Sequence, residues 1–121
     1  VWVERILDGL PVAEFDALRA MLGQPVETLA AKVGLSPATL ARRRADGKPL
    51  SRDHGDRIIR YARLFRKASD LFDGDASAAR SWLASPAPAL GQRTPLDYAE
   101  TELGAREVED LIGRLEYGVY V

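Results

Sequence analysis

The chain has 121 residues, of which 46% are hydrophobic and 29% are charged, and its formal net charge is −1. This size and composition are typical of a globular protein with one domain or two small subdomains. Because the chain has no cysteine, disulfide bonds, thiolate metal ligands and a cysteine nucleophile are excluded. No apolar run approaches the roughly 20 residues of a membrane-spanning helix, and no secretory leader is visible, so we expect a cytoplasmic protein without a membrane partner.

The near-neutral total hides a charge asymmetry along the chain. Residues 36–69 hold ten basic and three acidic residues, a net charge of +7, and residues 70–121 hold four basic and ten acidic ones, a net charge of −6. A basic segment attracts the phosphates of nucleic acids, which repel an acidic segment. The asymmetry therefore favours two partners of opposite character, although solvated helix faces that cluster by chance are the alternative.

Helix signals dominate the amino-terminal part of the chain. No segment alternates apolar and polar residues for long enough to indicate a strand, so we predict an all-α fold. A short helix or an extended arm is expected over residues 1–10. Pro11 then opens a helix whose apolar residues recur at helical spacing and which stops at Gly23.

Two short helices follow around a glycine. The first is expected over residues 25–33 and is closed by Gly34, and the second is capped by Ser36, spans residues 37–46 and stops at Gly47. Two short helices joined at a glycine are typical of the helix-turn-helix that reads DNA. An ordinary helical hairpin is the alternative.

If the motif reads DNA, the helix over residues 37–46 enters the major groove. Arg42 is then placed to contact a guanine, and Thr39 to reach a phosphate or a thymine methyl group. Because Ala38 and Ala41 also face outward, direct base readout is expected to be thin, and phosphate contacts and DNA shape carry more of the binding. The candidate DNA-binding residues are Ser36, Thr39, Arg42, Arg43, Arg44 and Lys48.

A long helix is expected next, from about Arg52 to Phe72. Its apolar stripe is predicted to consist of Ile58, Tyr61, Ala62, Phe65, Ala68 and Phe72, and its basic face of Arg57, Arg60, Arg63 and Lys67. His54, the only histidine, lies at the polar start of this helix, and we expect its side chain to be solvated.

The acidic part of the chain also shows helical signals. We predict a helix over residues 76–84, a loop over 85–91 and a helix over 95–103 that is capped by Thr94. Gly104 is predicted to separate this helix from the last one, whose apolar residues are Val108, Leu111, Ile112 and Leu115.

Several motifs of this part resemble the toxin-binding domain of the Xre/MbcA/ParS antitoxin family. They are Ala79-Arg80-Ser81-Trp82-Leu83-Ala84-Ser85-Pro86, Leu90-Gly91-Gln92-Arg93-Thr94-Pro95-Leu96-Asp97, Thr101-Glu102-Leu103-Gly104 and Leu111-Ile112-Gly113-Arg114-Leu115-Glu116-Tyr117-Gly118. Upstream, Thr39-Leu40-Ala41-Arg42-Arg43, Pro49-Leu50-Ser51 and Asp56-Arg57 resemble the family's Xre-type DNA-binding half. The chain departs from the family at Ala87, where asparagine is frequent, and at Gly91-Gln92, where Gly-Gly is frequent.

The resemblance implies an antitoxin of a type II toxin–antitoxin system. Residues 1–69 would be the helix-turn-helix region, which represses the antitoxin's own operon through operator DNA, and residues 70–121 would bind the toxin. The expected toxin has a RES domain that consumes NAD⁺, and the expected assembly is a homodimer within a larger toxin–antitoxin complex.

The carboxy-terminal residues suit a binding surface. Tyrosines and valines at a chain end are unusual because such ends are normally polar, and aromatic residues with a polar tip are favoured interface anchors. We expect this tail to enter the NAD⁺ pocket of the toxin, the alternative being that it packs on its own core. The candidate toxin-binding residues are Glu116, Tyr117, Gly118, Val119, Tyr120 and Val121.

The sequence shows no catalytic set, no nucleotide fingerprint and no metal-ligand cluster. We therefore expect no enzyme activity, no cofactor and no metal. Two other functions stay open: a stand-alone helix-turn-helix transcriptional regulator, and an interaction module whose basic face binds another protein.

Overall fold

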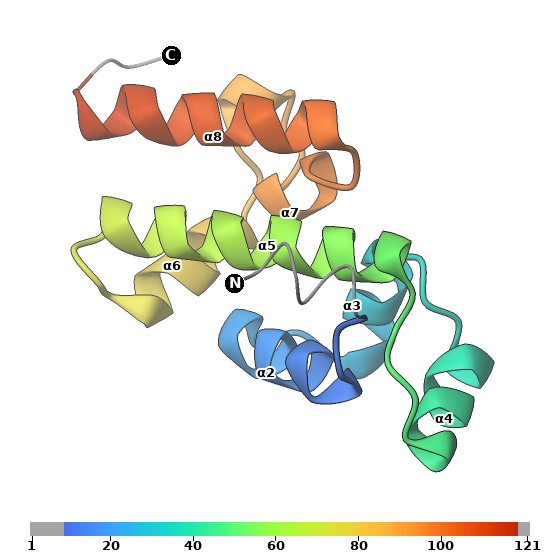
Figure 1. Ribbon diagram of the computed structural model, residues 1–121. Coiled ribbons are helices and arrows are strands. Elements are labelled where there is room, and N and C mark those ends of the chain that lie inside the picture. The colour runs from blue at the N-terminus through green and yellow to red at the C-terminus, as the bar shows by residue number, and fades with distance from the viewer. Residues whose placement is uncertain (1–8, 119–121) are drawn as a thin grey trace. The chain divides into compact units, whose positions relative to one another are not determined.

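The computed structural model describes residues 9–118, and within them the all-α prediction is confirmed (Figure 1). The only extended pairing in this range is an isolated antiparallel bridge between Ala87 and Arg93. The chain divides into two compact units, residues 1–59 and 60–121, and the division falls inside one long helix, α5 (Arg52–Leu71). No helix among the described residues is long and apolar enough to cross a membrane.

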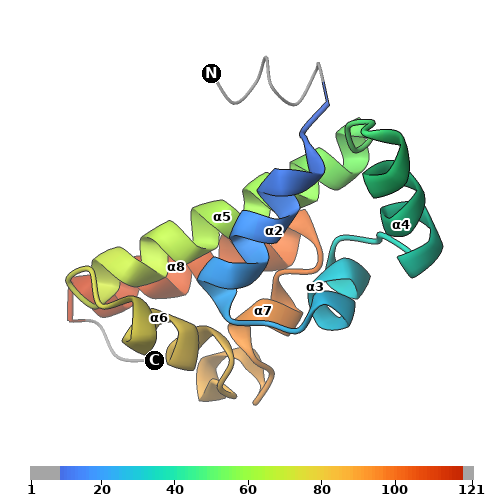
Figure 2. The ribbon, with the colours of Figure 1, turned by 90° about the horizontal axis from the view of Figure 1, so that it is seen from below.

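The first unit contains α2 (Val12–Leu22), α3 (Val26–Lys32), α4 (Pro37–Asp46) and the start of α5. Figure 2 shows the short turn that joins α3 to α4. The core of this first unit consists of buried side chains, which are Leu10, Phe15, Leu18, Leu22, Leu29, Ala30, Val33, Leu35, Leu40, Leu50 and Ile58. Met21, which has the helical spacing of a core residue, is exposed instead.

The bounds of α4 agree with the prediction because its ends carry strong local signals. The Ser36 hydroxyl accepts a hydrogen bond from the Thr39 backbone N–H, which satisfies one of the free donors of the first turn. At the other end Gly47 adopts a left-handed conformation with φ of 65°, which glycine enters without steric cost.

The second unit contains the rest of α5, α6 (Ala76–Leu83), the 3₁₀ turn η1 (Pro88–Leu90), α7 (Pro95–Tyr98) and α8 (Glu102–Glu116). Its buried side chains include Tyr61, Leu64, Leu83, Leu96, Val108, Leu111 and Ile112. The Tyr61 hydroxyl donates to the Leu96 carbonyl at 3.1 Å and so ties α5 to α7. Burial raises the pKa of the Tyr61 phenol, which keeps it neutral and able to donate.

The predicted apolar stripe of α5 was partly wrong. Leu64, which the stripe left out, is fully buried, whereas Phe65 and Phe72 are half-buried. The long helix turns both Tyr61 and Leu64, three residues apart, toward the core, so the buried face is wider on that side than the prediction assumed.

The prediction for residues 95–103 was also wrong. α7 ends at Tyr98, and Thr101 caps α8 by accepting a hydrogen bond from the Gly104 N–H at 3.0 Å. Gly104 therefore lies inside the first turn of α8 and does not separate two helices. A Cβ atom at Gly104 would overlap the Tyr98 carbonyl oxygen, so the glycine permits a close approach of two backbones rather than ending a helix.

Candidate functional site

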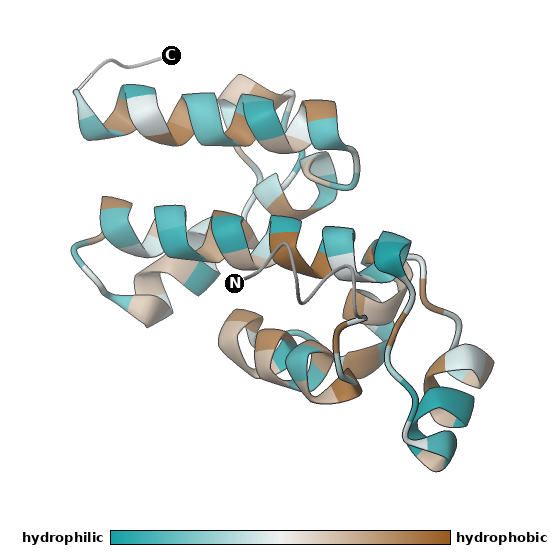
Figure 3. Ribbon diagram, in the orientation of Figure 1, coloured by the Kyte–Doolittle hydropathy of each residue, from teal (hydrophilic) through white to brown (hydrophobic). Residues whose placement is uncertain are grey.

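The exposed face of α4 carries the candidate DNA-reading positions. Ser36, Ala38, Ala41 and Arg42 are exposed, and Thr39 is half-buried. The Ser36 hydroxyl donates to the Thr39 hydroxyl at 2.9 Å, so the two hydroxyls hold each other at the start of the helix. In the hydropathy colouring, the carboxyl-terminal part of α4 is strongly hydrophilic (Figure 3).

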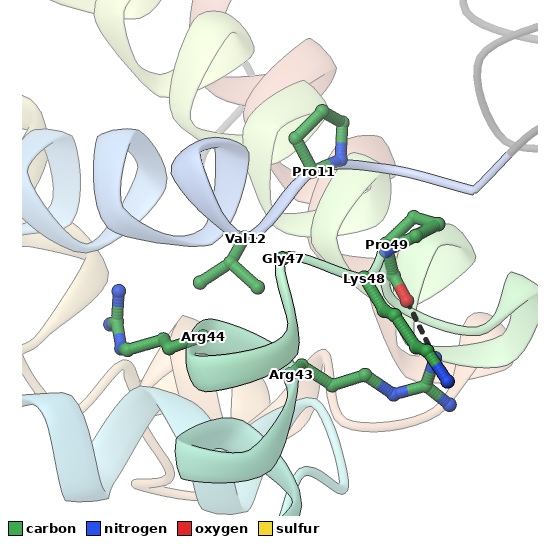
Figure 4. A pocket seen from close by; sticks show the side chains of 7 residues that line it. All are labelled: Pro11, Val12, Arg43, Arg44, Gly47, Lys48 and Pro49. Atoms are coloured by element: carbon green, nitrogen blue, oxygen red, sulfur yellow. Dashed lines mark hydrogen bonds between the residues drawn. The ribbon is translucent and has the colours of Figure 1, made fainter.

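Three of the candidate cations line a small hollow at the carboxyl end of α4, with a volume of about 230 Å³. Arg43 donates to the Pro49 carbonyl at 2.8 Å, and this bond fixes its guanidinium on the same side as Lys48 (Figure 4). Within residues 9–118, Lys48 and Arg42 make no hydrogen bond or ion pair. Arg43 and Lys48 together therefore present positive charge that suits a phosphate group.

Arg44 points to the other side of this hollow from Arg43 and Lys48 (Figure 4). Its guanidinium donates to both carboxylate oxygens of Asp16 in α2, at 2.8 and 2.6 Å. The hydrogen bond from Arg44 holds the pKa of Asp16 below its usual value, so the pair stays charged. Arg44 thus links α4 to α2, and a phosphate would have to compete with Asp16 for it.

The turn between α3 and α4 is held by two side chains from the start of α5. Arg57 donates to the Val33 carbonyl at 3.2 Å, and its guanidinium occupies the space where a side chain at Gly34 would begin. The His54 Nε2 atom lies 3.1 Å from the Gly34 carbonyl oxygen, and its Nδ1 atom lies 2.9 Å from the Ser51 hydroxyl.

A carbonyl oxygen can only accept, so the His54 Nε2–H is the donor, and in this tautomer of the neutral ring Nδ1 accepts from Ser51. His54 is half-buried and has a partner at both ring nitrogens, so its side chain is partly solvated and also bonded, which the expectation of a solvated side chain did not include. Sequence reasoning missed both His54 and Arg57 as residues that hold the turn before α4, because their partners are backbone carbonyls about twenty residues away in the chain.

The other cations of α5 bond within the second unit. Arg60 donates to the Glu100 carbonyl at 3.0 Å, and Arg63 and Lys67 both contact Glu109 of α8 at 2.8 Å. Burial opposes ionisation of Glu109, but the hydrogen bonds from Lys67 and Arg63 outweigh it and lower its pKa. The side chains of the predicted basic face thus bond to carbonyl and carboxylate groups of the same chain.

This pairing changes how the charge asymmetry is interpreted. Counted by structural unit, residues 1–59 contain nine basic and eight acidic residues, and residues 60–121 contain eight basic and ten acidic ones. The net charges are then +1 and −2. Among the described residues, four of the ten cations of the +7 segment are paired with carboxylates of the same chain, namely Arg44, Arg60, Arg63 and Lys67.

Three of the six candidate toxin-binding residues, Glu116, Tyr117 and Gly118, lie at the end of α8. Glu116 is its last residue, and the Tyr117 side chain after it is 88% exposed. Gly118 has φ of 74°, a left-handed conformation that leads the chain away from the helix direction. Val119, Tyr120 and Val121 lie outside the described residues. Among those that are described, no group of acidic residues and histidine could hold a metal ion.

Comparison with known proteins agrees with the division of the chain into two structural units near residue 60. Residues 1–63 match the antitoxin Xre-like helix-turn-helix domain, and residues 67–118 match the antitoxin Xre/MbcA/ParS C-terminal toxin-binding domain. The chain belongs to the Xre antitoxin family. An antitoxin Xre from Yersinia enterocolitica is 38% identical over 99% of this chain and 81% of its own length.

Two further relatives of this Xre-family antitoxin cover most of the chain. An antitoxin Xre from Photorhabdus laumondii is 33% identical over 93% of the chain and 76% of its own length. A Prs ADP-ribosylating antitoxin from Sphingobium sp. is 24% identical over 95% of the chain and 77% of its own length. The chain is therefore an antitoxin with a helix-turn-helix domain and a toxin-binding domain.

Proposed function

We propose that this antitoxin neutralises a RES-domain toxin that consumes NAD⁺, by placing its carboxy-terminal tail in the toxin's substrate pocket. The observation that carries the proposal is Tyr117, whose large side chain stands 88% exposed at the end of the toxin-binding domain. An exposed aromatic residue with a polar tip is a favoured interface anchor. The acidic groups beside it, such as Glu116, would pair with the cations that otherwise hold NAD⁺ phosphates.

The choice of an NAD⁺-consuming toxin has support from one relative. The Sphingobium protein is named for ADP-ribosylation of Prs, and ADP-ribosylation takes its ADP-ribose from NAD⁺. A tail that fills an NAD⁺ pocket would block either NAD⁺ hydrolysis or ADP-ribosyl transfer. The shared chemistry is therefore occlusion of the NAD⁺ site, and the RES-domain toxin is the member of this class that we propose.

We also propose that the antitoxin represses its own operon through α4. Arg42 would contact a base edge, Arg43 and Lys48 would hold phosphates, and Ser36, Thr39 and Arg44 would complete the DNA-binding set. In this proposal residues 1–69 bind the operator, residues 70–121 bind the toxin, and the chain acts in the cytoplasm as a homodimer within a larger complex.

Co-expression with the adjacent gene tests the main proposal. The neighbour expressed alone should deplete NAD⁺ and stop growth, and the antitoxin should restore both. Deleting residues 117–121 should abolish the rescue while the chain stays folded. The tail mechanism is wrong if the truncated chain still protects the cell. A harmless neighbour would favour a stand-alone regulator, for which promoter binding is then the relevant assay.

A further inference from the structure

A hollow at the amino-terminal end of α8 has no role in the site described above. It has a volume of about 330 Å³ and lies within the toxin-binding unit, between the end of α7, the turn over residues 99–101 and the start of α8. The Tyr98 hydroxyl donates to Glu107 at 2.8 Å and so fixes one wall. The close approach of Gly104 to the Tyr98 carbonyl sets the distance between the end of α7 and the start of α8.

The hollow combines negative charge with an exposed apolar side chain. Its lining includes the carboxylates Asp97, Glu100 and Glu107 against the single cation Arg93. Leu103 stands at the same site and is 71% exposed, although a leucine on a helix normally turns toward the core. An arginine or lysine side chain has the matching chemistry, because its apolar stem covers a leucine while its charged head meets carboxylates.

Leu103 also lies on the same face of α8 as Tyr117. Fourteen residues separate them, so on an ideal helix they are within about 40° of the same direction and about 21 Å apart. The residues between them on this face are Glu107, Asp110 and Arg114, and all three are exposed. Leu103 and Tyr117 are also two of the three exposed large hydrophobic residues in the range 9–118.

We propose that this outer face of α8 is a docking surface for the toxin, separate from the tail, and that a basic side chain of the toxin enters the acidic hollow beside Leu103. The proposal rests on the proposed function, since it takes the toxin as the partner. A stable protein interface buries roughly 800 Å² per partner and takes about 20 to 30 residues a side, more than residues 117–121 supply. A second contact at the far end of α8 would add to this area.

The test measures the affinity of the purified full-length antitoxin for the purified product of the adjacent gene. Glu100→Lys should weaken binding at least about ten-fold, mainly through slower association, because it repels the incoming cation. Leu103→Ser should weaken binding about ten-fold by removing the apolar anchor. Both residues are exposed, so both variants should keep the far-UV circular dichroism and the Tm of the wild type.

Two variants of the first unit serve as matched controls. Glu27→Lys makes the same charge change, and Met21→Ser removes the remaining exposed large hydrophobic side chain. Both should bind the toxin within about two-fold of the wild type.

The outcomes separate the two proposals. If the wild type binds and both hollow variants bind equally well, the docking surface is overturned and the proposed function stands. If Leu103→Ser leaves toxin binding intact but changes the sedimentation of the antitoxin alone, the surface belongs to self-association and the proposal is overturned. If the wild type does not bind the neighbour at all, the proposed function fails, and the docking surface fails with it.

Discussion

Arginine and lysine side chains have different partners in the two units. In the helix-turn-helix unit, Arg42 and Lys48 make no bond within residues 9–118, and Arg43 bonds only to a backbone carbonyl. In the toxin-binding unit, Arg63 and Lys67 are both bonded to Glu109. The comparison teaches that the number of cations in a segment does not measure the charge it offers to DNA. What decides is whether carboxylates of the same unit are already bonded to those cations.

The largest effect is expected from a glycine on which only the toxin-binding unit depends. Gly104→Ala places a Cβ atom on the Tyr98 carbonyl oxygen, and neither backbone can move freely because Thr101 caps the helix there. We expect the free energy of unfolding to fall by about 3 kcal/mol or more, measured by urea denaturation.

Gly113→Ala in the same helix is the control for this variant. Outside its chain neighbours and the backbone of its own helix, no atom lies within 4 Å of the added Cβ, so this variant should raise the stability by up to about 1 kcal/mol. A Gly104→Ala variant as stable as the wild type would show that the two backbones can separate without cost.

The next largest effect is expected on operator affinity, in a comparison of Arg42 with Arg63. Arg42→Ala should lower operator affinity about ten-fold or more, since a good arginine–guanine contact is worth about 1 to 3 kcal/mol. Arg63→Ala should leave operator affinity within about two-fold, because Arg63 is engaged by Glu102 and Glu109. A titration of fluorescent operator DNA measures both. Equal losses for the two variants would mean that the bonds of Arg63 open when DNA binds.

Removing the charge of Glu109 should lower the stability of the protein without changing its affinity for DNA. The side chain is 15% exposed and accepts bonds from two cations, so Glu109→Gln should lower the free energy of unfolding by about 1 to 2 kcal/mol at pH 7. Asp110→Asn, which changes an exposed neighbour, should change it by less than about 0.5 kcal/mol.

The same variant predicts a pH dependence. Because the folded protein lowers the pKa of Glu109 from its usual 4.5, the carboxylate contributes stability above that pH, and the contribution is lost as the pH falls through the lower folded value. The difference between the wild type and Glu109→Gln should therefore be constant near neutrality and shrink below about pH 4.5. A difference that grows on acidification would contradict the assignment.

The smallest effect concerns the loop before α7. Gln92 has φ of 69°, a left-handed conformation that costs a residue with a side chain about 1 to 2 kcal/mol. A glycine at this position would avoid that cost. Gln92→Gly should raise stability by about 0.5 to 1 kcal/mol after its larger loss of chain entropy. Gly91→Ala, at φ of 65°, should lower stability, and urea denaturation of both variants measures the pair.

Local signals made the helices predictable, and non-local contacts were what the sequence could not show. Gly23 and Gly47 end helices through their own backbone conformation, and Ser36 starts one through its own hydroxyl, so α4 was predicted with the bounds it has. Gly104 carries the same local signal and was therefore predicted to end a helix. Its actual role is to let the backbone approach the Tyr98 carbonyl across a turn, which the sequence does not show. The exposure of α4 followed from periodicity, whereas the partners of Arg44, His54 and Arg63 depend on the folded arrangement.

The outward residues of α4 are separate from the residues that fix the orientation of the helix. Ala38, Ala41 and Arg42 are exposed, while the orientation of the helix is fixed elsewhere, by Arg57 and His54 at the preceding turn. Substitutions at such surface positions usually change stability by less than about 0.5 kcal/mol. In the proposed DNA-binding mode, the residues that would meet the operator can therefore change at almost no cost to folding, so operator preference and fold stability depend on separate positions.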